Sequence, residues 1–392
     1  MRWLRAQLTR ADRALARMSG RRRVVVDART PMNFAILAPV FERLRRDPRV
    51  EVCFTADEPS GDAADGVPAR VRTRAALKWR RIDLALSADP WDPIVLRRCD
   101  ARLNFFHGVA GKYDLDSPGH LPIDFGQYDR VGFVNADRMR RYLDAGVVSR
   151  EAAVLIGYPK IDALANGRYD PAAVHARLQL EMHRRTVIYA PTWSPASSLH
   201  LAGEAIVEHL VASGFNVIVK LHDRSLDRTD PKYSGGVDWR ARFARLHRPG
   251  RIAFVEAADA SPLLAASDVM VTDHSSIGFE FCLLDRPLIV FDAPDLPRVA
   301  RINPEKIAQL RSAARVVYAA DEVGPAALDE LAHPDRASAA RRQIVTDLFY
   351  EPGTATGRAL HVVYELLDLP MHVQAVPGEV PGDLRHQHGL TS

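Results

Sequence analysis

The stretch that decides the fold spans residues 267–292 and reads S-D-V-M-V-T-D-H-S-S-I-G-F-E-F-C-L-L-D-R-P-L-I-V-F-D. Val269–Thr272 is short and mostly β-branched, which predicts a buried parallel strand. A two-residue turn and an apolar helical segment follow, and Leu288–Phe291 predicts the next strand. The order strand, turn, helix, strand is typical of an α/β fold.

The start of the predicted helix has the features of an anion site. Ser275 and Ser276 supply two hydroxyls beside free backbone N–H groups, and we assign them to substrate binding together with Thr272 and Asp273 at the strand end. Open α/β sheets bind ligands at such strand ends. The alternative is that Ser275 only caps the helix, and the dipeptide alone does not decide between the two.

The same alternation of strands and helices occurs along the whole chain and predicts parallel sheets. Strands are predicted at residues 24–27, 50–55, 84–86, 102–106, 131–134 and 153–156, and again at residues 186–190, 216–221, 252–255, 269–272, 288–291 and 316–318. Helices are predicted at residues 33–46 and 137–145, and one or two more at residues 336–369.

The composition is that of a globular protein large enough for two cores. Of 392 residues, 47% are hydrophobic and 26% are charged, and the net charge is +4. No apolar run approaches the ~20 residues that span a bilayer, and we expect no secretory signal. Cys53, Cys99 and Cys282 are far apart, so neither a zinc site nor a disulfide framework is expected.

Several function classes lack their motifs. The sequence has no Walker loop, no G-x-G-x-x-G and no H-E-x-x-H, which argues against a P-loop kinase, a simple NAD enzyme and a zincin. A D-x-D at Asp114 and Asp116 is a weak metal signal, since such loops are more often plain turns. Nucleic acid is not an expected partner.

Residues 1–20 predict a separate basic amphipathic helix. Leu4, Leu8, Leu15 and other apolar residues recur at helical spacing, with arginines between them and Trp3 at the start. Such a helix can lie on an anionic membrane surface. The alternative is a helix that packs on its own domain or on a partner chain.

The stretch at residues 267–292, with Y-A-P-T-W at residues 189–193 and G-Y-P at residues 157–159, resembles the CDP-glycerol glycerophosphotransferase family. These GT-B enzymes build teichoic-acid and capsule poly(polyol phosphate) chains. The resemblance covers roughly residues 100–360 and is strongest in the C-terminal half. His274 is a mild departure, because members usually have tyrosine there.

The resemblance implies a GT-B-like α/β fold, with two Rossmann-like domains whose parallel sheets face a central cleft. We expect an N-terminal acceptor domain at residues 21–165 and a C-terminal nucleotide-donor domain at residues 166–345. A closing helix at residues 346–369 would cross back to the first domain, and residues 370–392 would form a flexible tail.

The resemblance also assigns a catalytic base. His107 and Gly108 match the H-G of a W-H-G motif whose histidine is the family's proposed general base, with Phe106 in place of tryptophan. Gly108 is expected to contact the substrate. Histidine suits proton transfer at neutral pH. The alternative is a structural histidine at a strand end.

A second motif, K-x-H-P in the family, reads Lys220, Leu221, His222, Asp223 here. Lys220 and His222 point the same way from an extended strand end and can face a pyrophosphate. We assign His222 a catalytic role and Lys220 a substrate-binding one. Aspartate in place of proline changes the loop and adds a negative charge near an anion site.

Pro191 and Thr192 follow another strand and are expected to contact phosphate or acceptor. Family members usually have an arginine soon after the next tryptophan, but Ser194 follows here. Arg224 is a candidate to supply the missing charge.

The implied function is transfer of glycerol phosphate, or a related polyol phosphate, from a CDP-activated donor to a hydroxyl of a glycan or teichoic-type polymer. No cofactor or metal ion is required by this chemistry. We expect a cytoplasmic protein, peripheral on the inner face of the membrane. The alternatives are a GT-B glycosyltransferase that uses a nucleotide sugar, and a degenerate member that only binds a nucleotide or a partner.

Deleting residues 1–20 tests the membrane prediction. The full chain is expected to float with anionic liposomes at low salt and the truncated chain to stay in solution, because basic and apolar faces act together at such surfaces. Both forms are expected to give the same melting temperature. A full chain that does not float would disprove the membrane contact.

Overall fold

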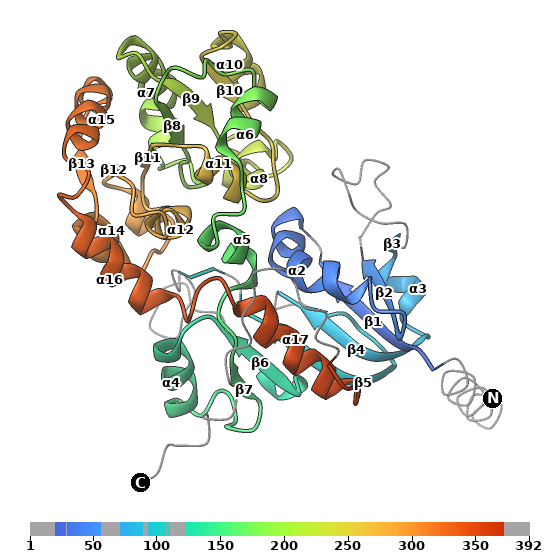
Figure 1. Cartoon of the computed structure of the whole chain (residues 1–392). Coiled ribbons are helices and arrows are strands. Elements are labelled where there is room, and N and C mark those ends of the chain that lie inside the picture. Colours follow the sequence, from blue (N-terminus) through green and yellow to red (C-terminus); the bar gives the residue numbers. More distant parts are fainter. Residues whose placement is uncertain are drawn as a thin grey trace.

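Two α/β lobes, each built on one parallel sheet, make up the protein (Figure 1). The computed structural model describes residues 20–28, 30–55, 71–88, 93–106, 108–109 and 123–371. The expected helix at residues 1–20 and most of the expected tail lie outside these ranges, as does the D-x-D at Asp114.

The first lobe has a seven-stranded sheet in the order β3-β2-β1-β4-β5-β6-β7. All its pairings are parallel, and the central strand β1 is apolar and buried from Val24 to Val26. The strands are β1 (Arg22–Asp27), β2 (Val50–Thr55), β3 (Val71–Arg72), β4 (Arg81–Ser87), β5 (Arg98–Phe105), β6 (Arg130–Phe133) and β7 (Ala153–Leu155).

Helices cover this sheet. Thr30 caps the first long helix in a reciprocal capping box with Asn33, which satisfies otherwise unpaired N–H groups. The helices of this lobe are α2 (Pro31–Leu44), α3 (Arg74–Leu77) and α4 (Ala136–Asp144), with the short turn η1 (Phe125–Gln127).

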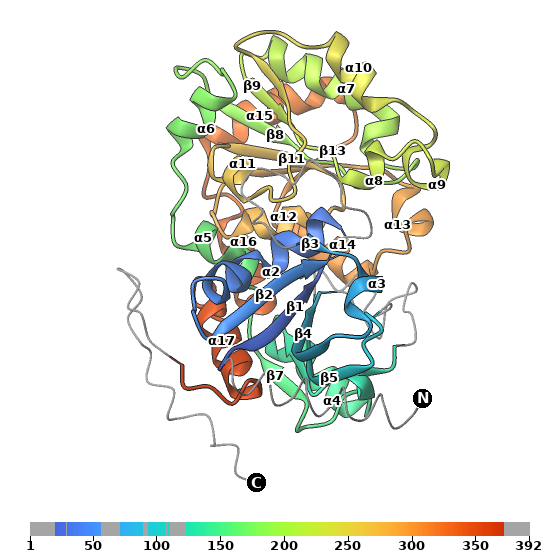
Figure 2. The same cartoon turned by 90° about the vertical axis from the view of Figure 1, so that its right-hand side faces the viewer.

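The second lobe has a six-stranded parallel sheet in the order β10-β9-β8-β11-β12-β13 (Figure 2). The strands are β8 (Thr186–Tyr189), β9 (Asn216–Val219), β10 (Ile252–Phe254), β11 (Val269–Thr272), β12 (Leu288–Phe291) and β13 (Arg315–Val317). Its helices are α7 (Ser198–Ala212), α8 (Asp223–Leu226), α9 (Pro231–Ser234), α10 (Trp239–Arg245), α11 (Ser261–Ala265), α12 (Ile277–Cys282), α13 (Leu296–Val299), α14 (Pro304–Ser312), η3 (Ala320–Glu322) and α15 (Val323–Ala332).

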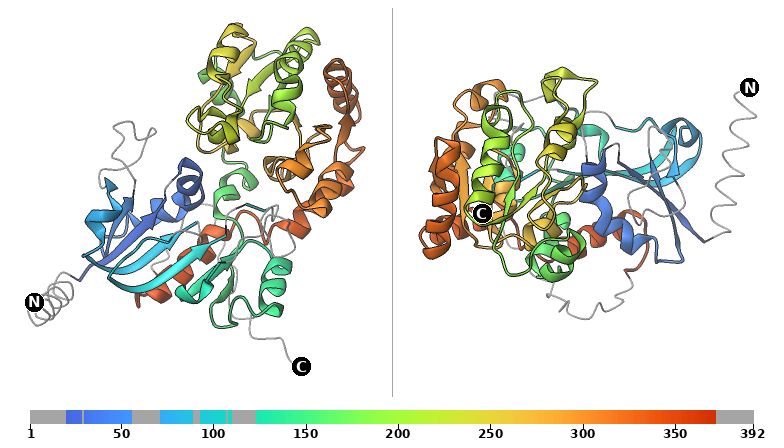
Figure 3. Two further views of the ribbon diagram at one scale, coloured as in Figure 1. Left: turned by 180° about the vertical axis from the view of Figure 1, so that it is seen from behind. Right: turned by 90° about the horizontal axis from the view of Figure 1, so that it is seen from above.

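Two segments connect the lobes. The outgoing segment carries η2 (Pro159–Ile161), α5 (Asp162–Ala165) and α6 (Pro171–Arg177). The returning segment carries α16 (Ser338–Leu348) and α17 (Ala355–Leu366), and α17 lies against α2 and η2 in the first lobe (Figure 3). The buried carboxylate of Asp162 accepts hydrogen bonds from the backbone of Gly353, Ala355 and Thr356 at 2.6–3.1 Å, and so joins the two segments.

A buried ion pair joins the lobes beside this connection. Nζ of Lys160, in η2, lies 2.9 and 2.7 Å from the two carboxylate oxygens of Glu280, in α12. The two side chains are 3% and 6% exposed. Burial opposes the charge on Lys160, but Glu280 outweighs it and raises the pKa of the ammonium, so Lys160 keeps its positive charge at neutral pH.

The strands predicted from sequence are present, with ends that differ by a few residues. Val269–Thr272 and Leu288–Phe291 match their predictions, while β9 ends at Val219 rather than at residue 221. The apolar helical segment predicted between β11 and β12 forms α12, which ends at Cys282. In the part of the chain that the structure describes, no helix is both long enough and apolar enough to cross a membrane.

Replacing Lys160 with alanine tests the ion pair. The substitution leaves Glu280 buried and uncompensated, which should lower the free energy of unfolding by about 3–5 kcal/mol in urea titrations. The double variant Lys160→Met/Glu280→Leu should lose much less, because no charge stays buried. As a control, Arg298→Ala removes an exposed pair with Asp295 and should cost less than ~1 kcal/mol. A Lys160→Ala loss as small as that of the control would contradict the assignment.

Candidate active site

The predicted site residues of the second lobe come from three adjacent strands. In the sheet, β8 lies between β9 and β11, and all three run parallel. Their carboxyl ends therefore meet at one edge. This brings together the loops that carry Thr192, Lys220 and Ser275, which are distant in sequence.

Asp273 holds this edge together. One of its carboxylate oxygens accepts the backbone N–H of Thr192 at 2.9 Å. The other accepts the backbone N–H and the hydroxyl of Ser198, at the start of α7, at 3.1 and 3.0 Å. Thr272 donates its hydroxyl to the carbonyl oxygen of Ala190 at 2.6 Å. Both Asp273 and Thr272 are fully buried, so these hydrogen bonds make them the framework of the site.

Thr192 and Pro191 are buried in the loop that Asp273 fixes. The Thr192 hydroxyl is buried, and within the described residues it has no hydrogen-bond partner. A buried hydroxyl of this kind is expected to have a partner, because leaving it unpaired costs free energy. This unpaired hydroxyl is consistent with the predicted contact between Thr192 and a ligand, which stays a prediction.

Ser275 and Ser276 lie at the turn before α12, and Ser276 is the N-cap residue. Ser276 makes no side-chain capping hydrogen bond, and its backbone is already helical. Ser275 is half-buried and Ser276 is exposed. A capping role for the Ser276 hydroxyl is therefore not observed, and both serines remain predicted ligand contacts.

Lys220 follows β9 and is half-buried, with Nζ donating to the carbonyl oxygen of Leu221 at 2.6 Å. Burial lowers the pKa of its ammonium to about 8. The group is thus mostly charged at pH 7 and loses its charge as the pH rises above 8. A bound anion beside Lys220 would favour the charged ammonium and raise its pKa again.

His222 forms a close pair with Asp223, the residue that follows it. Nδ1 of the ring contacts the Asp223 carboxylate, and the backbone N–H of Arg224 lies 3.0 Å from the same carboxylate oxygen. Burial lowers the pKa of His222. Burial also opposes the charge on Asp223, but the ring and the backbone outweigh it and lower the pKa of the carboxyl to about 2.

Arg224 packs against two aromatic rings. Its guanidinium carbon lies 4.8 Å from the ring centre of Trp193 and 4.7 Å from that of Tyr233, and the two rings meet edge to face. In the described part of the chain its side chain has no carboxylate partner, unlike Arg240, which pairs with Glu256. Stacking leaves the in-plane N–H donors of Arg224 available to an anion.

His107, the predicted base, lies outside the described residues, but its neighbours Phe106 and Gly108, which follow β5 of the first lobe, are described. Gly108 has a left-handed backbone, with φ of +74°, which favours glycine. Its carbonyl oxygen accepts a hydrogen bond from Arg138 at 3.1 Å, and its backbone N–H contacts the Tyr158 hydroxyl. The Arg138 guanidinium also stacks 4.3 Å from the ring centre of Phe106. Both residues that flank His107 are therefore firmly held.

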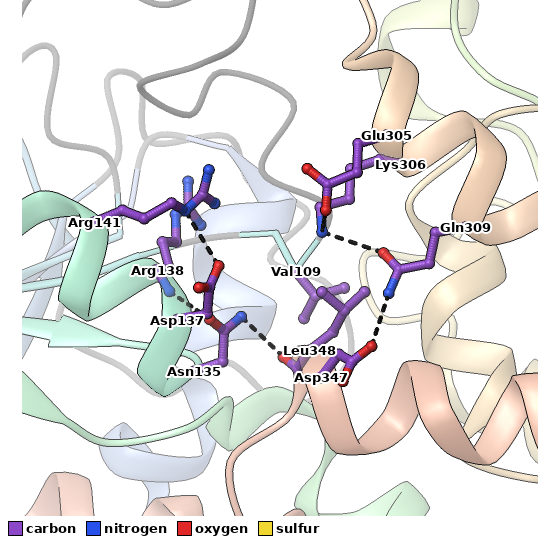
Figure 4. Close-up of a pocket in the computed structure, with 10 residues that line it drawn as sticks. All are labelled: Val109, Asn135, Asp137, Arg138, Arg141, Glu305, Lys306, Gln309, Asp347 and Leu348. Atoms are coloured by element: carbon purple, nitrogen blue, oxygen red, sulfur yellow. Dashed lines mark hydrogen bonds and ion pairs between the residues drawn. The ribbon is translucent and has the colours of Figure 1, made fainter.

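A cavity of about 300 Å³ opens between α4 of the first lobe and α14 and α16 (Figure 4). Its charges are balanced, with three basic and three acidic side chains, so it does not favour an anion. It reaches the loop after β5 but contains none of the predicted site residues. The lining residues are Val109, Asn135, Asp137, Arg138, Arg141, Glu305, Lys306, Gln309, Asp347 and Leu348.

Sequence reasoning missed several residues of this site. Tyr233 completes the stack on Arg224, Ser198 completes the bonding of Asp273, and Lys160 and Glu280 fix α12 to the first lobe. None of them belongs to a recognisable local motif. Within the described residues, no group of three or more possible metal ligands is found.

Comparisons with known proteins agree with this architecture. The model of a family described as CDP-Glycerol:Poly(glycerophosphate) glycerophosphotransferase matches residues 133–365. A structure of the wall teichoic acid polymerase TagF soaked with CDPG is similar at a TM-score of 0.69 and 15% identity, over 89% of this chain and 90% of that chain. The likeness confirms the expected GT-B-like α/β fold.

Two curated proteins match part of the chain. A teichoic acid glycerol-phosphate transferase of Staphylococcus aureus is 27% identical over 163 residues, 38% of each chain. A teichoic acid glycerol-phosphate primase of Bacillus spizizenii is 26% identical over 175 residues, which are 43% of this chain and 41% of the primase. The chain spans about two fifths of the length of these relatives.

Replacing both Ser275 and Ser276 with alanine tests the serine pair as a ligand site. Each hydroxyl lost from a charged ligand should cost ~1.5–3 kcal/mol, so affinity for CDP-glycerol, the donor that the resemblance implies, should fall at least tenfold in calorimetry. The melting temperature should hardly change, because the Ser276 hydroxyl caps nothing.

The control is Ser312→Ala, whose hydroxyl bonds to Gln309 on α14. It should leave affinity unchanged. If CMP and CDP-glycerol bind the double variant as tightly as they bind the original chain, the serines do not contact the donor. If only CDP-glycerol loses affinity, they contact the β-phosphate.

Proposed function

The chain belongs to the CDP-glycerol:poly(glycerophosphate) glycerophosphotransferase family, and we propose that it transfers a polyol phosphate from a CDP-activated donor to a hydroxyl acceptor. Glycerol phosphate is the proposed group, the acceptor is a cell-surface glycan or teichoic-type polymer, and CMP is released. The names of the matching relatives, a transferase and a primase for teichoic acid glycerol phosphate, support this choice.

The reaction is a phosphoryl transfer between two oxygens. The acceptor hydroxyl attacks the β-phosphorus of the donor, and its proton passes to His107 as general base. The bond between the β-phosphorus and the bridging oxygen breaks, and CMP leaves with the electron pair. The protein supplies positioning and charge stabilisation in this scheme, and no covalent intermediate with the chain is needed.

The second lobe holds the phosphates. Lys220, His222 and Arg224 lie within five residues after β9, and the Thr192 hydroxyl and the serine pair come from the two neighbouring strand ends. Charge moves toward the CMP phosphate as the bond breaks. Donors that are already in place stabilise that charge without reorganisation.

The observation that carries the proposal is the stacked Arg224. Two rings fix a guanidinium at the strand edge, and no carboxylate of the described residues neutralises its side chain. It stands beside Trp193, next to Ser194, where the family usually has its arginine. A fixed and unneutralised cation at this position suits a diphosphate ligand.

We also propose that the protein works on the inner face of the cell membrane. The acceptor chemistry and the basic amphipathic pattern of residues 1–20 support this location.

A donor-release assay tests the function. The chain is incubated with CDP-glycerol, CDP-ribitol, UDP-sugars or GDP-sugars and a glycerol-phosphate acceptor, and the released nucleotide is measured. CMP should form from a CDP-polyol, and His107→Ala should reduce the rate by about 10²–10⁴ with little change in donor Kd. UDP or GDP release would instead identify a glycosyltransferase, and no release from any donor would identify a degenerate member.

A further inference from the structure

The pairing of His222 with Asp223 fixes the position of a proton. Nδ1 and a carboxylate oxygen lie in direct contact, closer than two lone pairs would allow. A proton on Nδ1 turns this contact into a hydrogen bond, with nitrogen as donor and carboxylate as acceptor. The backbone N–H of Arg224 lies 3.0 Å from the same oxygen and 3.2 Å from Nδ1. With the proton on Nδ1 that nitrogen has no lone pair in the ring plane to accept it, so the N–H donates to the nearer carboxylate oxygen.

This assignment sets the chemistry of the ring. In a neutral imidazole only one nitrogen carries a proton, so a proton on Nδ1 leaves the lone pair on Nε2. The His222 side chain is 31% exposed and lies beside the Trp193 ring, whose centre is 6.3 Å from its own. The ring is therefore at the same strand edge as stacked Arg224, with Nε2 as the nitrogen that carries the lone pair.

From this geometry we infer that Asp223 is a positioning residue, which holds His222 so that Nε2 takes up a proton and donates it as a hydrogen bond to the bound diphosphate. The proton comes from solvent and stays on the ring, while Asp223 remains ionised and stabilises the imidazolium. This inference deepens the proposed function and rests on it, because the diphosphate is that of the donor.

The charges around the ring are consistent with a neutral resting state. Asp223 favours the imidazolium, while Lys220, Arg224 and burial oppose it, and the balance lowers the pKa of His222. An anionic ligand bound beside His222, Lys220 and Arg224 favours the imidazolium and so raises the pKa of His222. Donor binding should then draw one proton onto His222 at neutral pH, and affinity should fall as the pH rises.

A simpler reading of Asp223 makes the opposite prediction. If its carboxylate were only a negative charge near an anion site, removing that charge would strengthen donor binding at every pH. If Asp223 positions His222, removing its carboxylate weakens donor binding near neutral pH, where the free ring is neutral and must take up a proton. At acidic pH the ring is already protonated, and the removal matters little. The two readings therefore differ in sign.

The first test is the tautomer of His222 in the free chain, from ¹⁵N NMR of the ring with His222→Gln for assignment. The Nδ1–H form should dominate in the original chain and give way to Nε2–H in Asp223→Ala. A dominant Nε2–H form in the original chain would overturn the inference. This arm needs no ligand, so it holds or fails independently of the proposed function.

The second test is the pH dependence of CDP-glycerol affinity by calorimetry. Asp223→Asn should bind about tenfold more weakly than the original chain at pH 7.5, as for one unit of pKa, and within about twofold at pH 5.5. Asp223→Glu should recover part of the loss. The matched control Asp227→Asn, at the residue that follows α8 and bonded to Thr229, should change neither value.

Tighter binding by Asp223→Asn, or an equal loss at both pH values, would overturn the inference. The original chain could fail to bind CDP-glycerol while its Nδ1–H tautomer is intact and depends on Asp223. That outcome would refute the proposed donor and uphold the pairing of His222 with Asp223.

Discussion

The structure depends on one buried charge pair. Lys160 belongs to the segment that leaves the first lobe, and Glu280 belongs to α12 of the second. Each of these buried charges is costly without the other, so the pair selects one way of joining the lobes. Tyr158, two residues before Lys160, contacts the backbone of Gly108, and Glu280 lies on the helix that begins after the serine pair. One constraint thereby relates the two halves of the proposed reaction centre.

Within the second lobe, the polar residues divide into those that build the edge and those left for a ligand. Both carboxylate oxygens of Asp273 accept hydrogen bonds, one from Thr192 and the other from Ser198. The Thr272 hydroxyl donates to the carbonyl oxygen of Ala190, just after β8. The Thr192 hydroxyl has no partner among the described residues. The framework residues are fully buried, so they can orient the loops without competing for the ligand.

The fold was largely predictable from sequence, because apolar β-branched runs separated by helical segments determine a parallel sheet. The resemblance located the loops after β8, β9 and β11, and adjacency of these strands placed them together. The contacts across the site were not predictable. The hydrogen bond between Asp273 and Ser198 joins residues that are dozens of positions apart in the sequence. The stacking of Tyr233 on Arg224 depends on the path of the chain between α8 and α9. From sequence, Asp223 is only a negative charge near an anion site. Its contact with Nδ1 of His222 indicates a positioning role that the sequence does not predict.

The stacked guanidinium has a consequence for the thermodynamics of association. A free arginine side chain has many rotamers, and ordering it on a ligand costs about 0.5–1.5 kcal/mol. Trp193 and Tyr233 already hold Arg224 in one orientation before any ligand arrives. That entropy is lost when the chain folds rather than when the ligand binds. The second lobe should therefore capture its anion with little rearrangement of this side chain, and the speed of capture should be set by diffusion and electrostatic attraction.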